Sequence, residues 1–566
     1  MPSHERRRLD GDGRSAGGPA PGHRSARAQA PRHRPAAEAP GRSLAWQAHG
    51  RTRRRLGVGL LGIAAALTVW SLWAPSPGSS DPVHSAPTAC GPWAPAEATP
   101  VTLPVESTET WRRLRGVVVC FTHDLTITET YDLGRFAELL LADARLYGEN
   151  TGLEVDEPSL HVIRLGARQR PSGGEVWPLP WGLEVGQVRV GDAVVRLAGR
   201  VWRSPAGGYV LEPLGTPAFE VRNPRPAAPA PLLGDLRVAA FNLENYFLTL
   251  GARGADHPAA LERQTAKLVV ALAALDADVI AVMEVERDPD DRALRALSAA
   301  LDAHLEAAAA TALDAHLEAA TAPARSYLAV PEASASAGRP GDAVRQGFLI
   351  DPAVVEVVAL EADTATVHER PPQALTLRHR ASGERLTLIA VHLRSKARCP
   401  PSGDVDLGFG CWNERRTAQA RSLLAFGERL SQAQPGGLTL ILGDLNAHRF
   451  EPPLTVFESA TPAWRVLTDL VPPEEAVSHV FFGRSAALDH ALASPALAPR
   501  VGGVDYWAIN ADEPPLAGAG SGPRAPPGYR PDPYRSSDHD PVVVALHVGP
   551  PGGERAPAGE RAPAGE

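Results

Sequence analysis

Runs of apolar residues that end abruptly in polar ones recur along the second half of the chain. In the run Leu438–Leu442 the polar residue Thr439 is not part of any alternation, which indicates a strand that is buried on both faces. The run stops at Gly443, and Asp444 and Asn446 follow. Two residues apart in an extended chain, their side chains point the same way and could hold a hard cation or the water beside it. An isolated Gly-Asp-x-Asn is as readily an ordinary turn.

Similar polar clusters occur at several other strand ends, and they favour a cation site over an ordinary turn at Asp444 and Asn446. From Asp235 onwards apolar strands alternate with helical stretches such as Leu261–Leu275, which predicts an α/β domain over 235–548. Ligands gather at strand ends in such sheets. The combination of side chains suits metal-assisted phosphoester hydrolysis. The further clusters are Asn242 after Leu236–Phe241, Glu284 after Asp278–Met283, His392 after Leu386–Val391, Asp489 after Leu488, and Asp538 and His539 before Val542–Leu546.

A second pattern, short β-branched strands punctuated by Gly, occupies residues 111–222. It is typical of a small barrel or sandwich that forms a domain of its own. A Pro/Ala-rich linker follows and places the domain boundary near residue 230. The predicted strands are Gly116–Phe121, Leu125–Thr130, Phe136–Leu141, Val194–Trp202 and Tyr209–Leu214.

One helical stretch contains a duplication. Residues 300–308 recur at 312–320, and twelve residues rotate a helix roughly 120° out of phase, so one buried face cannot continue through both copies. The pattern predicts a surface helix whose His304 and His316 are solvated rather than ligands.

Composition changes this picture mainly at the ends of the chain. Residues 1–55 hold thirteen Arg against four acids, a net charge of about +9, which leaves about −17 for the remainder. This segment and the 549–566 tail lack apolar periodicity and are expected to be disordered. Because the body is acidic, bulk charge would not hold a polyanion, and a phosphodiester would need a local site with a metal and a few Arg.

The uncharged segment 56–74 directly follows Arg53-Arg54-Arg55, which is a membrane signal with the N-terminus in the cytoplasm. Its length fits either an uncleaved anchor or a long signal segment. We therefore expect an extracytoplasmic protein, membrane-anchored through 56–74 or secreted. Residues 75–110 are rich in Pro, Ser and Thr and are predicted to be a linker.

All four cysteines lie beyond the membrane segment, and an even number in an extracytoplasmic chain suggests disulfides. Cys399 and Cys411 flank a Gly/Pro/Asp-rich loop and are the natural pair. Cys90 and Cys120 would then pair by elimination. Four free thiols remain the alternative if the chain is not exported.

The ordered motifs resemble those of the endonuclease/exonuclease/phosphatase superfamily. They are Phe-Asn-Leu-Glu-Asn-Tyr-Phe from Phe241, Met-Glu-Val-Glu from Met283, His-Leu-Arg-Ser-Lys from His392, Gly-Asp-Leu-Asn-Ala from Gly443, Leu-Asp-His-Ala-Leu from Leu488 and Ser-Ser-Asp-His-Asp-Pro-Val from Ser536. The bacterial secreted extracellular-nuclease branch, which is similar to pancreatic deoxyribonuclease, fits best. The resemblance implies a four-layer α/β sandwich catalytic domain preceded by a small all-β OB-like domain. Val391 and Ala508 depart from the branch pattern.

The resemblance also implies a role for each matched residue. Glu284 is similar to the main metal-ligand acid, with Asn242 and Asp538 near the same cation. Oxygen ligands favour Mg²⁺, with Mn²⁺ or Ca²⁺ as alternatives. The remaining roles fall to five catalytic residues, three cationic residues that would bind flanking phosphates and four aromatic residues of the OB-like domain that could stack bases. They are Asp444 and Asn446 (water and phosphate), His539 held by Asp489 (general base or phosphate-polarising imidazole), His392 (phosphate and leaving oxygen), Arg263, Arg394 and Lys396 (flanking phosphates), and Trp177, Trp181, Trp202 and Tyr209 (bases).

The resulting hypothesis is an extracytoplasmic, metal-dependent nuclease that hydrolyses DNA, and possibly RNA, with little sequence preference. Two alternatives stay open: a phosphatase or phosphodiesterase of the same superfamily that acts on inositol- or sphingomyelin-type headgroups, and a non-catalytic surface protein that binds nucleic acid. The sequence predicts no protein partner.

Overall fold

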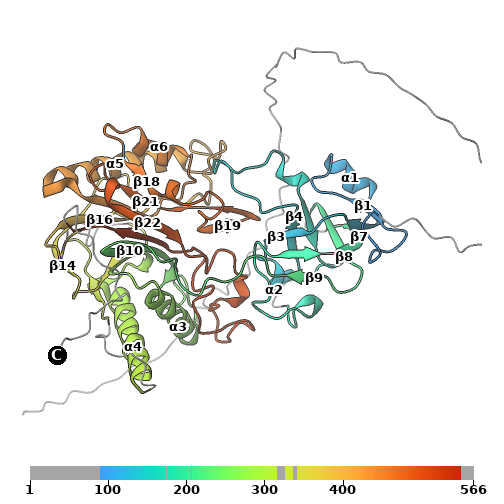
Figure 1. The fold of residues 1–566 in the computed structure, drawn as a ribbon, viewed down its shortest axis with the longest axis horizontal. Helices are drawn as coiled ribbons and strands as arrows, with labels where there is room; N and C mark the ends of the chain where they lie inside the picture. The colour runs from blue at the N-terminus through green and yellow to red at the C-terminus, as the bar shows by residue number, and fades with distance from the viewer. Residues whose placement is uncertain (1–88, 172–175, 205–206, 315–324, 335–340, 550–566) are drawn as a thin grey trace, which may run out of the picture. The chain divides into compact units, whose positions relative to one another are not determined.

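The computed structural model describes residues 89–171, 176–204, 207–314, 325–334 and 341–549 (Figure 1). The predictions for residues 1–55 and 56–74, and for nearly all of the 549–566 tail, lie outside these residues. Among the described residues, none of the helices has the length and apolar character needed to cross a membrane.

Two six-stranded mixed sheets form the α/β region. In the first sheet β10 and β11 are parallel, and in the second β16 and β17 are parallel, while the other neighbours run antiparallel. The first sheet has the order β12 (Leu328–Val330), β13 (Val344–Ile350), β11 (Val279–Glu286), β10 (Leu236–Tyr246), β23 (Val542–Leu546), β22 (Val501–Tyr506). The second has the order β14 (Val355–Ala362), β15 (Gln373–His379), β16 (Arg385–His392), β17 (Thr439–Asp444), β21 (Asp489–Ala493), β18 (Arg465–Val466).

The two sheets pack face to face because their central strands are apolar on both sides. On β10, Val238 and Ala240 join the core between the sheets, whereas Phe241 packs against helices on the outer face. On β17, Leu442 faces the other sheet and Ile441 faces helices. The lack of alternation in these runs thus reflects burial on both faces, as predicted.

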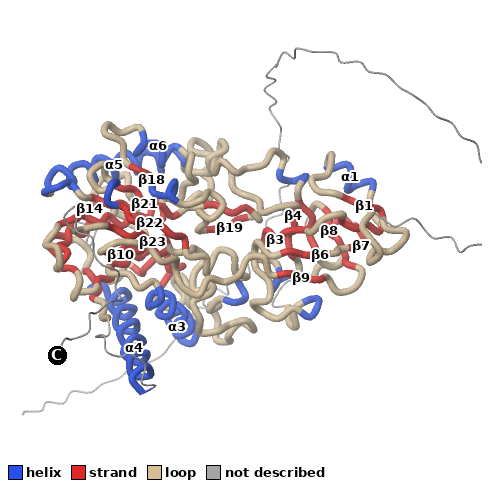
Figure 2. The backbone as a smooth tube through the Cα atoms, viewed as in Figure 1, coloured by secondary structure: helices blue, strands red, loops and turns tan. Residues whose placement is uncertain are grey.

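Helices cover the outer face of each sheet, as Figures 1 and 2 show. Helices α3 (Pro258–Ala274) and α4 (Arg292–Asp314) pack on the first sheet, and α5 (Asn413–Ala433) and α6 (Pro452–Glu458) pack on the second. The order helix–sheet–sheet–helix confirms the mixed α/β prediction for this region. The first copy of the twelve-residue repeat lies in α4, where His304 is partly exposed, and most of the second copy lies outside the described residues.

A nine-stranded sheet forms the β-rich region, whose OB-like character stays a prediction. Helices α1 (Thr108–Arg113) and α2 (Leu133–Phe136) flank it. Two details differ from the sequence reading. Phe136 ends α2 rather than starting a strand, and the run predicted from Val194 is split by a turn at Arg196, which adopts φ 51°. The sheet order is β1 (Thr99–Val101), β2 (Val118–Phe121), β7 (Ala198–Arg203), β8 (Tyr209–Pro213), β5 (Val162–Leu165), β4 (Leu139–Ala142), β3 (Leu125–Glu129), β6 (Ala193–Val195), β9 (Ala218–Glu220).

The domain's first strand, β1, lies within the range 75–110 that the composition indicated as a linker. Both disulfides form as paired from the sequence: Cys90 with Cys120, and Cys399 with Cys411. The first ties the segment before β1 to β2, so the β-rich region includes residues that precede its predicted start at residue 111.

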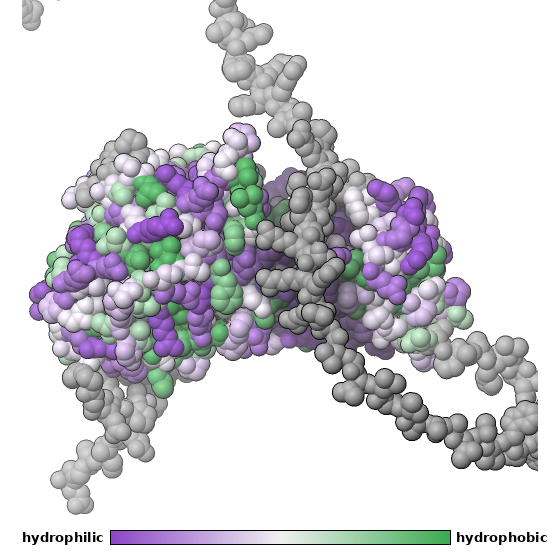
Figure 3. Space-filling view, turned by 90° about the horizontal axis from the view of Figure 1, so that it is seen from above, coloured by the Kyte–Doolittle hydropathy of each residue, from purple (hydrophilic) through white to green (hydrophobic). Residues whose placement is uncertain are grey.

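The visible surface in Figure 3 mixes hydrophilic and hydrophobic residues in small areas. Singly exposed apolar side chains are normal on a folded protein and need no explanation. Two adjacent exposed aromatic residues do need an explanation. Phe481 and Phe482 form such a pair on the two-stranded hairpin of β19 (His479–Phe481) and β20 (Arg484–Ala486).

Candidate active site

The two parallel strand pairs bring the predicted polar residues to one rim of the sandwich, which we call the catalytic rim. Asn242 pairs with Met283, the residue before Glu284, and His392 pairs with Asp444, so each pair of polar residues lies at the same edge. The two sheets meet there, because Asn242 Nδ2 donates to Asp444 Oδ2 at 3.3 Å. His392 Nε2 lies 3.3 Å from the same Asp444 oxygen and 3.9 Å from Glu284 Oε1.

Close packing between strands explains the glycine of the Gly-Asp-x-Asn motif. Gly443 adopts φ 137°, and a Cβ atom there would lie 2.2 Å from the carbonyl oxygen of Val391. Any side chain would therefore force β17 away from β16 and separate Asp444 from His392.

Several non-glycine residues at the rim adopt the left-handed backbone conformation. Glu284 has φ 61°, at a register shift between β11 and β13, and Asn446 has φ 50° just after β17. Such conformations cost of order 1–3 kcal/mol and persist where the surrounding structure enforces them, typically at functional sites. The bulge turns Glu284 towards the second sheet, where its carboxylate approaches His392.

His539 is oriented by Asp489. His539 Nδ1 lies 2.6 Å from Asp489 Oδ2, which also accepts a hydrogen bond from Ser478 Oγ at 2.7 Å. This pairing fixes the tautomer and leaves Nε2 of His539 available for chemistry. Although burial alone would lower it, the charges of Asp489 and Asp538 hold the pKa of His539 well above its usual value. The protonated imidazole is thus strongly stabilised.

The carboxylates of the rim repel one another. Burial, and next the charge of Asp489, raises the pKa of Asp444 to about 7, and burial together with Asp538 raises the pKa of Glu284. Asp489 Oδ1 is buried and accepts no hydrogen bond from the described residues. An excess of buried negative charge with an unsatisfied oxygen is the environment that a divalent cation neutralises.

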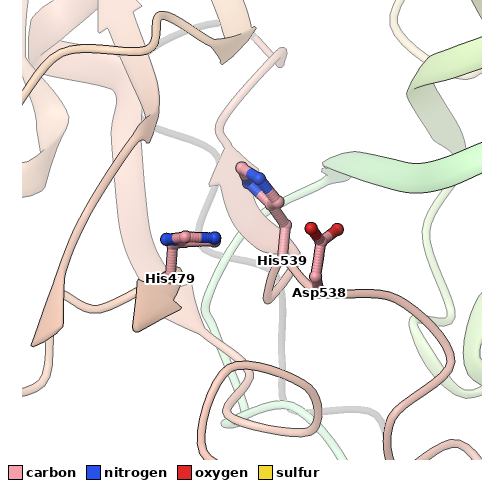
Figure 4. Close-up of side chains that lie close together, drawn as sticks. All are labelled: His479, Asp538 and His539. Carbon is pink, nitrogen blue, oxygen red and sulfur yellow. The ribbon is translucent and has the colours of Figure 1, made fainter. Parts of the chain in front are cut away.

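Two overlapping groups could hold such an ion. Asp444, Asp489 and His539 offer ligand atoms within 4.8 Å of one another, and so do His479, Asp538 and His539. Figure 4 shows the rings of His479 and His539 beside each other, with the Asp538 carboxylate next to His539. The predicted metal ligands Asn242 and Glu284 lie at the same rim, so the donor set fits a hard cation.

His392 differs in protonation from His539. Burial, and next the charge of Arg370, lowers the pKa of His392 well below its usual value, so the ring is neutral. Arg370 is buried and donates to the backbone carbonyls of His392, at 3.1 Å, and of Leu393. Asn446 Nδ2 donates to the same Leu393 carbonyl at 3.3 Å. Arg370 therefore holds the backbone of His392 directly, and it shares the Leu393 carbonyl with the side chain of Asn446.

Two of the three predicted phosphate-binding cations are engaged within the protein. Arg263 donates to four backbone carbonyls between Ala519 and Arg524, and Lys396 Nζ pairs with the buried Glu451 at 2.5 Å. The guanidinium of Arg394 instead stacks on Trp412 at 4.6 Å, and no carboxylate or carbonyl among the described residues engages it. Arg394 is thus the cation of the three that is best placed to contact a substrate phosphate.

Sequence reasoning missed His479 and the structural use of Arg370. His479 lies on β19, and its ring centroid is 4.9 Å from that of His539. Burial, and next the charge of His539, lowers the pKa of His479 to about 4. His479 precedes a run of only three apolar residues, Val480–Phe482, which is too short to predict a buried strand that ends at a polar residue.

The four aromatic residues proposed for base stacking lie in the β-rich region. Trp177 there is 55% exposed, and Trp202 donates to Glu212.

The chain resembles several solved structures. It is 14% identical to the catalytic domain of human nocturnin with bound sulfate (TM-score 0.31, 55% of this chain and 93% of that chain). It is 13% identical to a mannosyl-6-phosphatase from Bacteroides thetaiotaomicron (TM-score 0.36, 55% of this chain and 99% of that chain). It is 14% identical to D. rerio TDP2 complexed with single-strand DNA product (TM-score 0.33, 55% of this chain and 97% of that chain). A comparison with curated proteins gives no match.

A family model described as the endonuclease/exonuclease/phosphatase family matches residues 239–539, more than half of the chain. This span begins on β10, just before Asn242, and ends at His539. It therefore contains the whole catalytic rim. The chain belongs to the endonuclease/exonuclease/phosphatase family, whose members hydrolyse phosphate esters and are typically dependent on a divalent metal.

Proposed function

We propose that this protein is an extracytoplasmic, metal-dependent nuclease that hydrolyses the phosphodiester bonds of DNA, and possibly RNA. The observation that carries the proposal is the pairing of His539 with Asp489 at 2.6 Å beside a surplus of buried carboxylates. A base of this kind deprotonates water, and the carboxylates hold the cation that an anionic ester requires.

In this mechanism Glu284, Asn242 and Asp538 would hold Mg²⁺, or alternatively Mn²⁺ or Ca²⁺. When bound there, such a cation would supply the positive charge that the pentavalent transition state requires. At a pH above the raised pKa of His539, its Nε2 accepts the proton of the attacking water, and Asp489 stabilises the imidazolium that results. In its protonated form the same ring would polarise the phosphate instead. Asp444 and Asn446 orient the water and the phosphate, with Asn446 fixed by the Leu393 carbonyl.

His392 contacts the phosphate and assists departure of the leaving oxygen. Its ring is neutral and therefore carries a single N–H, and its Nε2 lies 3.3 Å from Asp444 Oδ2. A neutral imidazole in that position donates a hydrogen bond to a phosphate oxygen without adding a buried charge. Arg394 is the proposed contact for a flanking phosphate.

Both disulfides support the extracytoplasmic location, because disulfides form and persist in oxidising compartments. Membrane attachment through residues 56–74 and nucleic-acid binding by the OB-like domain are further parts of the proposal. Neither is needed for the chemistry at the rim.

The test offers the purified full chain supercoiled plasmid DNA, RNA, sphingomyelin and inositol phosphates, each with Mg²⁺ and with a chelator. We expect Mg²⁺-dependent cleavage of nucleic acid, its loss in Asp444→Ala and its retention in Glu356→Gln, a partly exposed acid on β14. Retained DNA binding by Asp444→Ala would locate the defect in catalysis.

Cleavage of the headgroup esters alone would replace the proposal with the phosphatase alternative. A parent protein that binds DNA but cleaves no substrate with Mg²⁺, Mn²⁺ or Ca²⁺ would make it a binding protein.

A further inference from the structure

The β19–β20 hairpin carries two adjacent exposed phenylalanines. His479 pairs with Ala486 and Phe481 with Arg484, so Phe482 and Gly483 form the turn. Phe481 is 62% exposed and Phe482 is 74% exposed, and their ring centroids lie 4.2 Å apart. Exposed aromatic pairs are unfavourable in water unless they meet a partner.

The turn itself does not call for a phenylalanine. Phe482 adopts φ 49° and Gly483 adopts φ 73°, which are the positive angles of a two-residue type I′ hairpin turn. Asn, Asp and Gly are strongly preferred at the first of these positions, and a bulky residue there is costly. A cost to folding at an exposed position indicates that the ring of Phe482 serves another purpose.

The two rings continue a row that begins at the catalytic base. The ring centroid of His479 lies 4.9 Å from that of His539 and 6.1 Å from that of Phe481, with interplanar angles of 46° and 34°. Exposure rises along the row, from the buried His539 through the partly exposed His479 to the two phenylalanines. The row therefore leads outward from the point where the scissile phosphate would sit.

Unpaired nucleobases are the ligand that this row fits best. Bases next to the scissile bond emerge along such a path, and they stack on aromatic side chains whatever their sequence. A lipid surface would instead be expected to select free cations beside the apolar residues. The hairpin cation, Arg484, is paired with Glu149 at 3.2 Å, and the whole chain has a formal charge of −8.

We propose that Phe481 and Phe482 form a stacking platform for unpaired nucleobases that flank the scissile phosphodiester, so that single-stranded nucleic acid is the preferred substrate class. This inference rests on the proposed nuclease function and assigns a substrate preference to the same site. Phe481 and Phe482 make no contact with the reacting atoms. They are binding residues, not catalytic ones.

The experiment compares the full-length parent protein with Phe481→Leu and Phe482→Asn on three substrates: a single-stranded oligonucleotide, the same strand with abasic positions next to the cleaved bond, and the base-free diester bis(p-nitrophenyl) phosphate. Leu keeps the apolar character of the first position, and Asn suits the turn better than Phe, so neither variant should disturb the hairpin. Phe481→Trp is the matched control that keeps an aromatic face.

We expect each of the two variants to lower kcat/KM on the oligonucleotide about tenfold, mainly through KM, because stacking of one base contributes about that much. Activity on the base-free diester should be unchanged, the abasic strand should show little difference between the proteins, and Phe481→Trp should match the parent. Double-stranded DNA should be cleaved less efficiently than the single strand by the parent protein.

Each other outcome overturns the inference in a distinct way. Equal losses on the oligonucleotide and the base-free diester would make the hairpin a support of the catalytic rim. Unchanged oligonucleotide cleavage with lost binding to sphingomyelin vesicles would make it a lipid contact. Oligonucleotide cleavage unchanged in all respects would remove the platform but leave the nuclease proposal intact. A parent protein that hydrolyses the base-free diester but no nucleic acid would refute the nuclease proposal itself.

Discussion

The two ends of the first sheet both carry clusters of acids, yet the clusters differ in how their charge is balanced. At the rim opposite the site, Arg325 pairs with Asp276 at 2.9 Å, with Asp278 at 2.9 Å and with Asp351 at 3.4 Å. We call this the structural rim. At the catalytic rim Glu284 stands near the other end of the same strand, β11, and its neighbours are acids and histidines rather than an arginine in direct contact.

This difference separates an acid cluster that stabilises the fold from one that is kept for chemistry. A buried carboxylate without a cation is costly, and folding tolerates it where function requires the charge. The three aspartates of the structural rim need no further partner, because Arg325 already supplies one. Burial and neighbouring carboxylates raise the pKa of Asp444 and of Glu284, which indicates that the described residues of the catalytic rim balance this negative charge only in part.

The largest expected effect is on turnover at the catalytic rim. Asp444→Asn keeps the shape of the side chain but removes the charge, and we expect kcat for DNA cleavage to fall by about 10³-fold, or roughly 4 kcal/mol of transition-state stabilisation. Thermal stability should be equal or higher, because a repulsive buried charge is gone. Single-turnover kinetics and calorimetric melting measure the two quantities. A variant that loses stability and activity in parallel would break the comparison.

A somewhat smaller effect is expected for the residue that orients the base. Asp489→Asn should lower kcat by about 10²-fold and shift the acid limb of the pH–rate profile to lower pH, because the neutral amide no longer raises the pKa of His539. The profile distinguishes orientation from a general structural defect, which would lower the rate equally at every pH. An unshifted profile would contradict the role of Asp489.

At the structural rim the expected effect is on stability alone. Arg325→Met leaves Asp278 and Asp351 buried without their cation, and we expect the free energy of unfolding to fall by about 1–3 kcal/mol, discounted because the guanidinium is partly exposed. Denaturant melts give the value, and kcat on DNA should stay within twofold of the parent. A loss of turnover would mean that the two rims are coupled.

The smallest effect is a pH-dependent gain of stability from Mg²⁺. The pKa of Asp444 is raised from 3.8 to about 7, so the folded state binds more protons than the unfolded state between these values, and stability falls as the pH rises through that window. A cation offsets the repulsion only where the carboxylates are ionised. We therefore expect Mg²⁺ to raise Tm by a few degrees at pH 8 and by much less at pH 5. An equal rise at both pH values would contradict this account.

The sequence reveals the chemistry of the catalytic rim better than its geometry. Apolar runs that stop at Asn242, His392 and Asp444 can be found from the residue pattern, because a strand buried on both faces ends where its polarity changes. The bulge that turns Glu284 cannot be found from the residue pattern, since it depends on the register between β11 and β13.

The roles of the cationic residues are equally hard to predict from the sequence. The sequence suggests Arg263 and Lys396 as phosphate contacts, but tertiary contacts with carbonyls and with Glu451 decide what they do. The Phe481–Phe482 pair lies outside the motifs that carry the resemblance, and its exposure becomes visible only once the hairpin is placed beside His539.

Titration with Mn²⁺, followed by electron paramagnetic resonance, tests most directly whether the catalytic rim is the cation site. The parent protein should bind Mn²⁺, Glu284→Gln should lose that binding, and Asp278→Asn, the matched change at the other end of β11, should retain it. Binding that survives in Glu284→Gln but disappears in Asp278→Asn, or a parent protein that binds no Mn²⁺, would contradict the assignment.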